Sequence, residues 1–75
     1  MSNNEEIILN QKIGRNIKRY RKDNDLIQKD LARKANVSRS TIACLESNNI
    51  SKGVSVFTLY KISRVLGKEI DNLLN

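Results

Sequence analysis

Apolar residues recur at three- and four-residue spacing along most of the chain, which is the pattern of helices that bury one face. The first stripe consists of Ile13, Ile17 and Tyr20 and predicts a helix over residues 11–25. Four further stripes predict helices over residues 28–35, 38–48, 55–67 and 68–75. No segment alternates apolar and polar residues in the manner of a strand. The pattern therefore predicts an all-α domain of five short helices.

Polar residues stand at the ends of these stripes. Ser38 and Ser55 are expected as N-caps, because a serine hydroxyl accepts a hydrogen bond from a first-turn N–H group. Gly67 is expected to end the fourth helix. Residues 1–10, which include the run "EEIIL", either extend the first helix or form an N-terminal arm, and residues 11–75 form the domain.

The second and third stripes are separated only by the lapse "KANVS". A connection of about two residues cannot reverse the chain, so the two helices must cross at roughly 90–120°, as in a helix-turn-helix. The corner requires one residue with positive φ, which glycine adopts most cheaply and asparagine next. Asn36 occupies this corner, Val37 is expected to fill it from the core side, and Ser38 caps the next helix.

The distribution of charge along the chain suggests a class of partner. The 75 residues carry 14 Lys and Arg against 8 Asp and Glu, a formal charge of +6. Residues 12–39 hold a net charge of +7, residues 1–11 hold −2 and residues 40–75 hold +1. A concentrated positive block suggests a polyanionic partner. A solubilising surface is the alternative, and charge alone does not decide between the two.

Residue usage excludes several chemistries. With one cysteine and no histidine, the chain has no internal disulfide, no Cys/His zinc site and no Cys–His or Ser–His nucleophile pair. We therefore expect no enzyme activity, no cofactor, no metal and no small-molecule ligand. No apolar run approaches the ~18 residues of a membrane span, so we expect a cytoplasmic protein without a membrane partner.

Four segments at matching spacing carry a family resemblance: "IGRNIKRYR", "LIQKDLARKANVSRSTIACLE", "VFTLYKISRVLG" and the final "LL". Over residues 12–75 the chain resembles the Cro/repressor-type helix-turn-helix family, also called the xenobiotic-response-element family. The resemblance implies a compact five-helix, lambda-repressor-like domain with the motif at residues 28–47. Three positions depart from the family pattern. Ile27 replaces a capping Ser or Thr, Asp25 replaces a common glycine, and Lys68 replaces an apolar residue.

The outward face of the third helix supplies the candidate base contacts. Each helical residue turns by about 100°, so Ile42 and Leu45 point inward and the opposite face carries Arg39, Ser40, Ala43, Cys44 and Ser47. In helix-turn-helix proteins the N-terminal end of this helix enters the major groove of DNA. We expect DNA base contacts from Arg39, Ser40, Ala43 and Cys44.

Two of these residues leave alternatives open. Arg39 can pair with guanine O6 and N7 or contact a phosphate. Cys44 is interpreted first as a small residue that permits close approach to DNA, second as a contact to a thymine methyl, and last as a redox sensor.

Further residues are expected to contact the DNA backbone. The resemblance implies that Gln28 bonds a phosphate and braces the recognition helix. The full set of expected phosphate contacts is Gln28, Lys29, Ser38, Ser47, Asn48, Asn49 and Lys52. Lys18, Arg19, Arg33 and Lys34 are interpreted as solvated charges. By resemblance, Arg21 and Glu46 form an ion pair that is structural and does not contact DNA.

The leading hypothesis is a transcriptional regulator, repressor or controller protein that binds operator DNA as a homodimer, with recognition helices about 34 Å apart. The dimer is expected through Ile70, Leu73 and Leu74 of the last helix. Tyr60 is expected to assist, whereas Phe57 is expected in the core. Since 75 residues leave little room for a sensor domain, regulation through protein concentration is expected, as in phage repressors and restriction–modification controllers. The alternative is an antitoxin that binds a toxin protein through residues 1–10 and represses its own operon.

Overall fold

Five helices make up the part of the chain that the computed structural model describes, which is residues 4–47 and 54–75. In chain order they are α1 (Asn4–Asp23), α2 (Gln28–Ala35), α3 (Arg39–Glu46), α4 (Val56–Leu66) and α5 (Ile70–Leu74). The described residues contain no strand. The predicted all-α class and the predicted helix order are confirmed.

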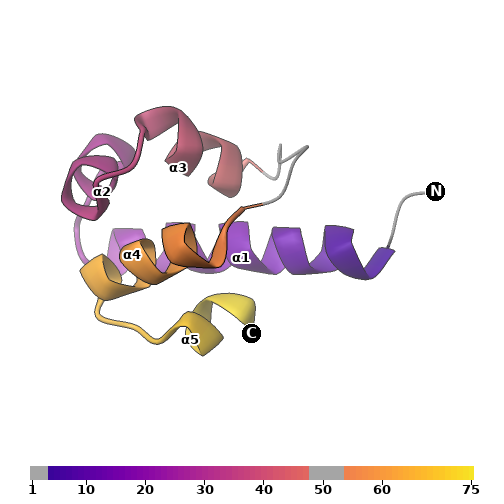
Figure 1. The fold of residues 1–75 in the computed structure, drawn as a ribbon. Coiled ribbons are helices and arrows are strands. Elements are labelled where there is room, and N and C mark those ends of the chain that lie inside the picture. Colours follow the sequence, from indigo (N-terminus) through magenta and orange to yellow (C-terminus); the bar gives the residue numbers. More distant parts are fainter. Residues whose placement is uncertain (1–3, 48–53) are drawn as a thin grey trace.

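The helix α1 is longer than the apolar stripe predicts. It begins at Asn4, so "EEIIL" is part of the helix, and it ends at Asp23. The chain then turns through Asp25, whose φ of 56° lies in the left-handed region. The N–H of Leu26 donates to the carbonyl of Arg21 at 3.0 Å and closes the turn. The N-terminal half of α1 extends past the other four helices (Figure 1).

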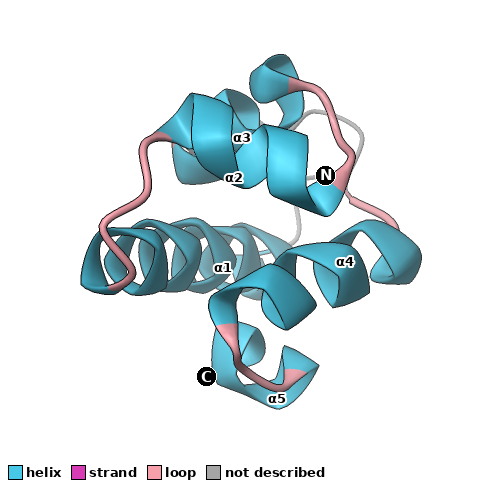
Figure 2. Ribbon diagram, turned by 90° about the vertical axis from the view of Figure 1, so that its left-hand side faces the viewer, coloured by secondary structure: helices cyan, strands magenta, loops and turns pink. Residues whose placement is uncertain are grey.

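The other helices pack around the second half of α1. The helices α3 and α5 contact α1 on two sides, while α2 contacts both α3 and α4. In the view of Figure 2, α2 and α3 form the upper layer, α1 and α4 lie side by side below them, and α5 lies beneath. The recognition-helix candidate α3 is thus held from below by α1 and from one side by α2.

Each helix contributes to one buried core. The buried apolar residues are Ile13, Ile17, Tyr20, Leu31, Ala32, Ala35, Ile42, Leu45, Leu59, Ile62, Leu66 and Leu73. Leu73 has no exposed surface, so the prediction that it lines a dimer interface is wrong. It points into the core because α5 packs against α1, where the side-chain amide of Asn16 donates to the carbonyl of Leu73 at 2.9 Å. Ile70 and Leu74 are half-buried.

The prediction for the first turn of α4 is also wrong. Phe57 is 66% exposed and does not enter the core, and its neighbour Val56 is 71% exposed. Phe57 lies five residues before the buried Ile62, which places it about 140° away around the helix. Lys61 instead covers the Phe57 ring, with its Nζ 5.0 Å from the ring centroid.

The corner between α2 and α3 forms as predicted. Asn36 has φ 57° and ψ 46°, so it is the left-handed residue that ends α2. The N–H of Val37 donates to the carbonyl of Ala32 at 3.0 Å, and the Val37 side chain packs against the core. Ser38 then caps α3 by accepting from the N–H of Thr41 at 3.0 Å. The geometry is therefore specified within three consecutive residues.

The remaining helix ends divide into capped and uncapped. Ser55 accepts a hydrogen bond from the N–H of Thr58 at 3.1 Å, and Gly67 ends α4 with a φ of 69°. Ile27 has N-cap geometry but makes no side-chain cap hydrogen bond, as its identity predicts. Lys68 lies over the ring of Tyr20, with 4.8 Å between its Nζ and the ring centroid. This contact accommodates a lysine where the family usually has an apolar residue.

No helix within residues 4–47 and 54–75 is long and apolar enough to cross a membrane. Those residues also contain no group of three or more His, Cys, Asp or Glu side chains that is placed to hold a metal ion.

Candidate nucleic-acid interface

The outward face of α3 is small and polar. Ile42 and Leu45 are buried beneath the helix, which leaves Arg39, Ser40 and Cys44 exposed and Ala43 half-buried. The face therefore carries one long cation at its N-terminal end and small side chains along its length. A surface of this shape allows the backbone of α3 to approach a groove closely.

The start of α2 lies beside the first two turns of α3. Gln28 shares with Arg39, Ser40 and Ala43 an open hollow of about 240 Å³. Four of the residues predicted to contact DNA are thus brought together, although they come from two helices. Arginine and glutamine side chains both offer pairs of hydrogen-bonding atoms that match base edges or phosphate oxygens.

A hydrogen-bonded network fixes Gln28 in this position. The Gln28 side-chain amide donates to Glu46 Oε1 at 3.1 Å. Arg21 donates to the same carboxylate through Nε, at 2.7 Å from Oε2, and through Nη2, at 2.9 Å from Oε1. A third donor, Arg21 Nη1, bonds the carbonyl of Leu26 at 2.7 Å. The predicted Arg21–Glu46 pair therefore forms, and it links α1, the start of α2 and α3.

The Arg21 guanidinium keeps its positive charge. The hydrogen bond that it donates to Glu46, aided by the negative charge of that carboxylate, raises the pKa of Arg21 above its ordinary value, although burial acts in the opposite direction. Arg21 is therefore protonated at neutral pH, as arginine is in proteins generally. Since the side chains of Arg21 and Glu46 are only 10% and 4% exposed, their charges are used within the fold and are not presented to a ligand.

A second hollow is lined by two cations that the sequence interpretation did not include among the DNA contacts. It has a volume of about 390 Å³ and runs between α1 and α3, with Lys18, Lys22, Gln28, Ala43 and Ser47 among its lining residues. Lys18 was interpreted as a solvated charge, and Lys22 was not singled out. Their positions in the sequence could have indicated this. Lys18 lies three residues before Arg21 and Lys22 lies one residue after it, and Arg21 is expected to reach α3.

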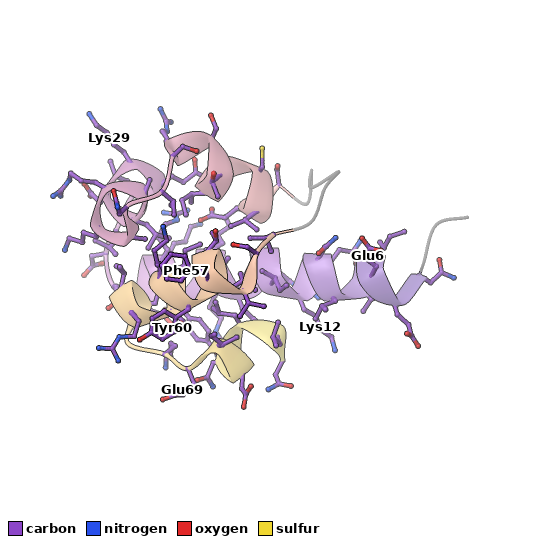
Figure 3. The ribbon with its side chains drawn as sticks, in the orientation of Figure 1. Glu6, Lys12, Lys29, Phe57, Tyr60 and Glu69 are labelled. Carbon is purple, nitrogen blue, oxygen red and sulfur yellow. The ribbon has the colours of Figure 1, made fainter. Side chains whose placement is uncertain are left out.

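The other predicted phosphate contacts are less closely grouped. Lys29 is exposed on the first turn of α2 and points away from the body of the molecule (Figure 3). The Ser38 hydroxyl lies 2.7 Å from Thr41 Oγ1 in addition to capping α3. Ser47 donates its hydroxyl to the carbonyl of Cys44 at 3.2 Å. Asn48, Asn49 and Lys52 lie outside the described residues.

Comparison with known proteins gives a family match over most of the chain. A profile described as helix-turn-helix matches residues 17–73. The chain is 38% identical over 63 residues to the HTH-type transcriptional regulator SinR of Bacillus licheniformis, covering 84% of this chain and 56% of SinR. The chain thus spans little more than half the length of this relative.

Two solved structures are similar. One is the master regulator for biofilm formation SinR in complex with DNA, with a TM-score of 0.79 and 36% identity over 84% of this chain and 98% of that chain. The other is the clp gene regulator ClgR of Corynebacterium glutamicum, with a TM-score of 0.79 and 26% identity over 88% of this chain and 68% of that chain.

Proposed function

The chain belongs to the helix-turn-helix family, and we propose that it is a transcriptional regulator that binds double-stranded DNA sequence-specifically through α3. The observation that carries this proposal is the joint placement of Gln28, Arg39, Ser40 and Ala43 around one open hollow. The structure of SinR with DNA supports the same use of this surface here. The function is binding, and no catalytic step is part of it.

Arg39 is the principal base contact in this proposal. It is exposed at the first residue of α3, the end that enters the major groove in helix-turn-helix complexes. Its guanidinium can donate two hydrogen bonds to O6 and N7 of one guanine. Ser40 bonds a neighbouring base edge, while Ala43 and Cys44 let the helix approach and contact thymine methyl groups.

The phosphate contacts position α3 over its site. Gln28 donates from the start of α2, where exposed amides also favour an anion, and Lys18 and Lys22 contact the strand that borders α1. Lys29, Ser38 and Ser47 complete the described part of this surface. These groups raise the affinity for any sequence and make it salt-dependent, but they do not select bases.

The protein acts as a homodimer in this proposal, because a single module of this size buries only about 600–1,000 Å² on DNA. The interface that the structure supports is centred on α4. Val56, Phe57 and Tyr60 are exposed there, and the half-buried Ile70 of α5 lines one hollow together with Tyr60. Figure 3 shows Phe57 and Tyr60 on the outward side of α4.

A footprint on the DNA upstream of the protein's own gene tests the proposal at roughly 150 mM salt. We expect a protected, partly palindromic site, and we expect Arg39→Ala to weaken its binding by ~1–3 kcal/mol with an unchanged circular dichroism spectrum. Competition with random-sequence DNA is the control for non-specific binding. If wild-type protein protects no site in this DNA, the proposed operator is not there. An unchanged base preference in Arg39→Ala would remove Arg39 from the recognition set.

A further inference from the structure

The N-terminal half of α1 exposes apolar side chains that neither the core nor the DNA-binding surface uses. Ile7, Ile8 and Leu9 are 44%, 51% and 41% exposed, and they lie on the part of α1 that extends past the other helices (Figure 1). The family match begins at residue 17. The matched residues therefore leave out this extension, defined here as residues 4–15, in which Ile13 and Gly14 are buried and the residues on the remaining sides are mostly exposed.

The order of charges along one face of the extension indicates its partner. Glu5, Ile8, Lys12 and Arg15 are spaced three, four and three residues apart, so they share one side of the helix. All four are exposed. The face is acidic at its start, apolar in the middle and basic at its end. A second helix with the same order matches it when the two run in opposite directions, since each acidic end then lies beside a basic end.

Lys12 and Glu6 lie on different sides of the extension. They point to different sides of α1 in Figure 3, as expected for residues six apart, which are about 120° apart around the helix. The apolar Ile8 and Leu9 follow Glu5 and precede Lys12, so they occupy the centre of the proposed contact. The extension also lies beyond the helices that carry Arg39 and Gln28, and pairing leaves that surface open.

We propose that the extension is a self-association surface that pairs antiparallel with the extension of a second copy of the chain. Ile8 and Leu9 of the two copies pack at the centre, and Glu5 of each copy lies beside Lys12 and Arg15 of the other. The contact is two-fold symmetric, so each copy contributes the same residues. It does not depend on DNA binding, and it uses a different helix from the proposed dimer interface on α4.

The size of this contact predicts a weak association. Two short helical segments bury less than the roughly 1,200 Å² of a standard stable interface. The contact therefore forms at high local concentration, as when two α4-linked dimers occupy adjacent sites on DNA. Its dependence on opposite charges also makes it stronger at low salt.

Sedimentation velocity of the full chain without DNA, over a concentration series at low salt, measures the contact. We expect Ile8→Asp to raise the concentration required for the extension-dependent step at least about tenfold, since a buried apolar contact becomes a buried charge. Ile8→Leu is the matched control and should associate like wild type. If the α4 interface forms, the step is from dimer to tetramer. If it does not, the step is from monomer to dimer. The species that form therefore show whether each of the two interfaces exists.

A charge exchange identifies the partner as a second copy. Glu5→Lys alone and Lys12→Glu alone place like charges together and should each weaken the step. An equimolar mixture of these two variants restores both opposite-charge pairs and should associate more strongly than either variant alone. Circular dichroism verifies that α1 stays helical in each. The proposal is overturned if Ile8→Asp sediments like wild type, if wild type shows no extension-dependent step, or if the mixture gains nothing.

Discussion

Arg21 holds three parts of the molecule together through one guanidinium. Its donors reach the Glu46 carboxylate on α3 and the Leu26 carbonyl before α2. Glu46 in turn accepts from Gln28, a predicted DNA contact. A single buried ion pair therefore sets the position of the start of α2 relative to the recognition helix.

Removal of one partner of this pair should be costly. Arg21→Met leaves the Glu46 carboxylate buried without its cation, so we expect the free energy of unfolding to fall by ~3–5 kcal/mol. Urea denaturation measures the change. The double variant Arg21→Met/Glu46→Leu should recover most of this loss, because no unpaired charge remains. A double variant as unstable as the single one would show that the loss comes from packing rather than from charge.

Ile27 offers a test in the opposite direction. It has N-cap geometry without a cap hydrogen bond and is 60% exposed, so its replacement removes little apolar burial. We expect Ile27→Ser to stabilise the protein by ~1 kcal/mol, measured by thermal or urea denaturation. Ile27→Ala, which cannot cap, is the matched control and should give no gain. Equal stability of the two variants would contradict the assignment of residue 27 as an unsatisfied N-cap.

Local stereochemistry explains which residues could be predicted from the sequence. The roles of Asn36, Ser38 and Gly67 depend on backbone conformation and on neighbours within a few positions, so the sequence alone is sufficient for them. The positions of Phe57 and Leu73 depend on how α4 and α5 pack against helices that are distant in sequence. An apolar residue near a helix end can be placed only when those packing partners are known.

At the scale of elements, α1 contributes both to the core and to the surface beside α3. Its second half carries the buried stripe and also lines the hollow beside α3 with Lys18 and Lys22. The stripe was predictable from its periodicity, because periodicity reports which face of a helix is buried. The hollow was not, because its shape depends on the crossing of α1 and α3.

Lys18 tests the contribution of α1 to DNA binding. We expect Lys18→Ala to weaken specific and non-specific DNA about equally and to reduce the salt slope of log K by about one unit. Fluorescence anisotropy over a salt series measures both quantities. Lys34→Ala removes an exposed charge on α2 that lines neither hollow, and it should leave the slope nearly unchanged. Equal slopes for wild type and Lys18→Ala would mean that Lys18 is a solvated charge.

At the scale of the whole molecule, the structure separates three surfaces: the polar face of α3, the aromatic face of α4, and the extension of α1. The exposure of Arg39, Ser40 and Cys44 on the first surface follows from the helix-turn-helix spacing, and their contacts with DNA stay a prediction. The second corrects that hypothesis, since Leu73 is in the core and Phe57 is outside it. The third precedes the residues that the family model matches, and it was identified from the exposure of Ile7, Ile8 and Leu9.

The α4 surface predicts the effect of a charge on dimer formation. We expect Tyr60→Asp to raise the dimer dissociation constant by about 30-fold or more, as expected for loss of a central aromatic contact. Sedimentation equilibrium without DNA measures it. Lys34→Asp, an exposed change on α2, is the control for a new negative charge. If Tyr60→Asp dimerises like wild type, the α4 face is not the dimer interface.

The most direct test of the central claim is selection of binding sites by the full chain from a pool of random double-stranded DNA at roughly 150 mM salt. The proposed function predicts an enriched motif with two inverted half-sites, their centres about one helical turn apart. It also predicts that Arg39→Ala loses base preference at a guanine in each half-site. A pool that shows no enriched motif after selection by wild-type protein would contradict sequence-specific binding through α3.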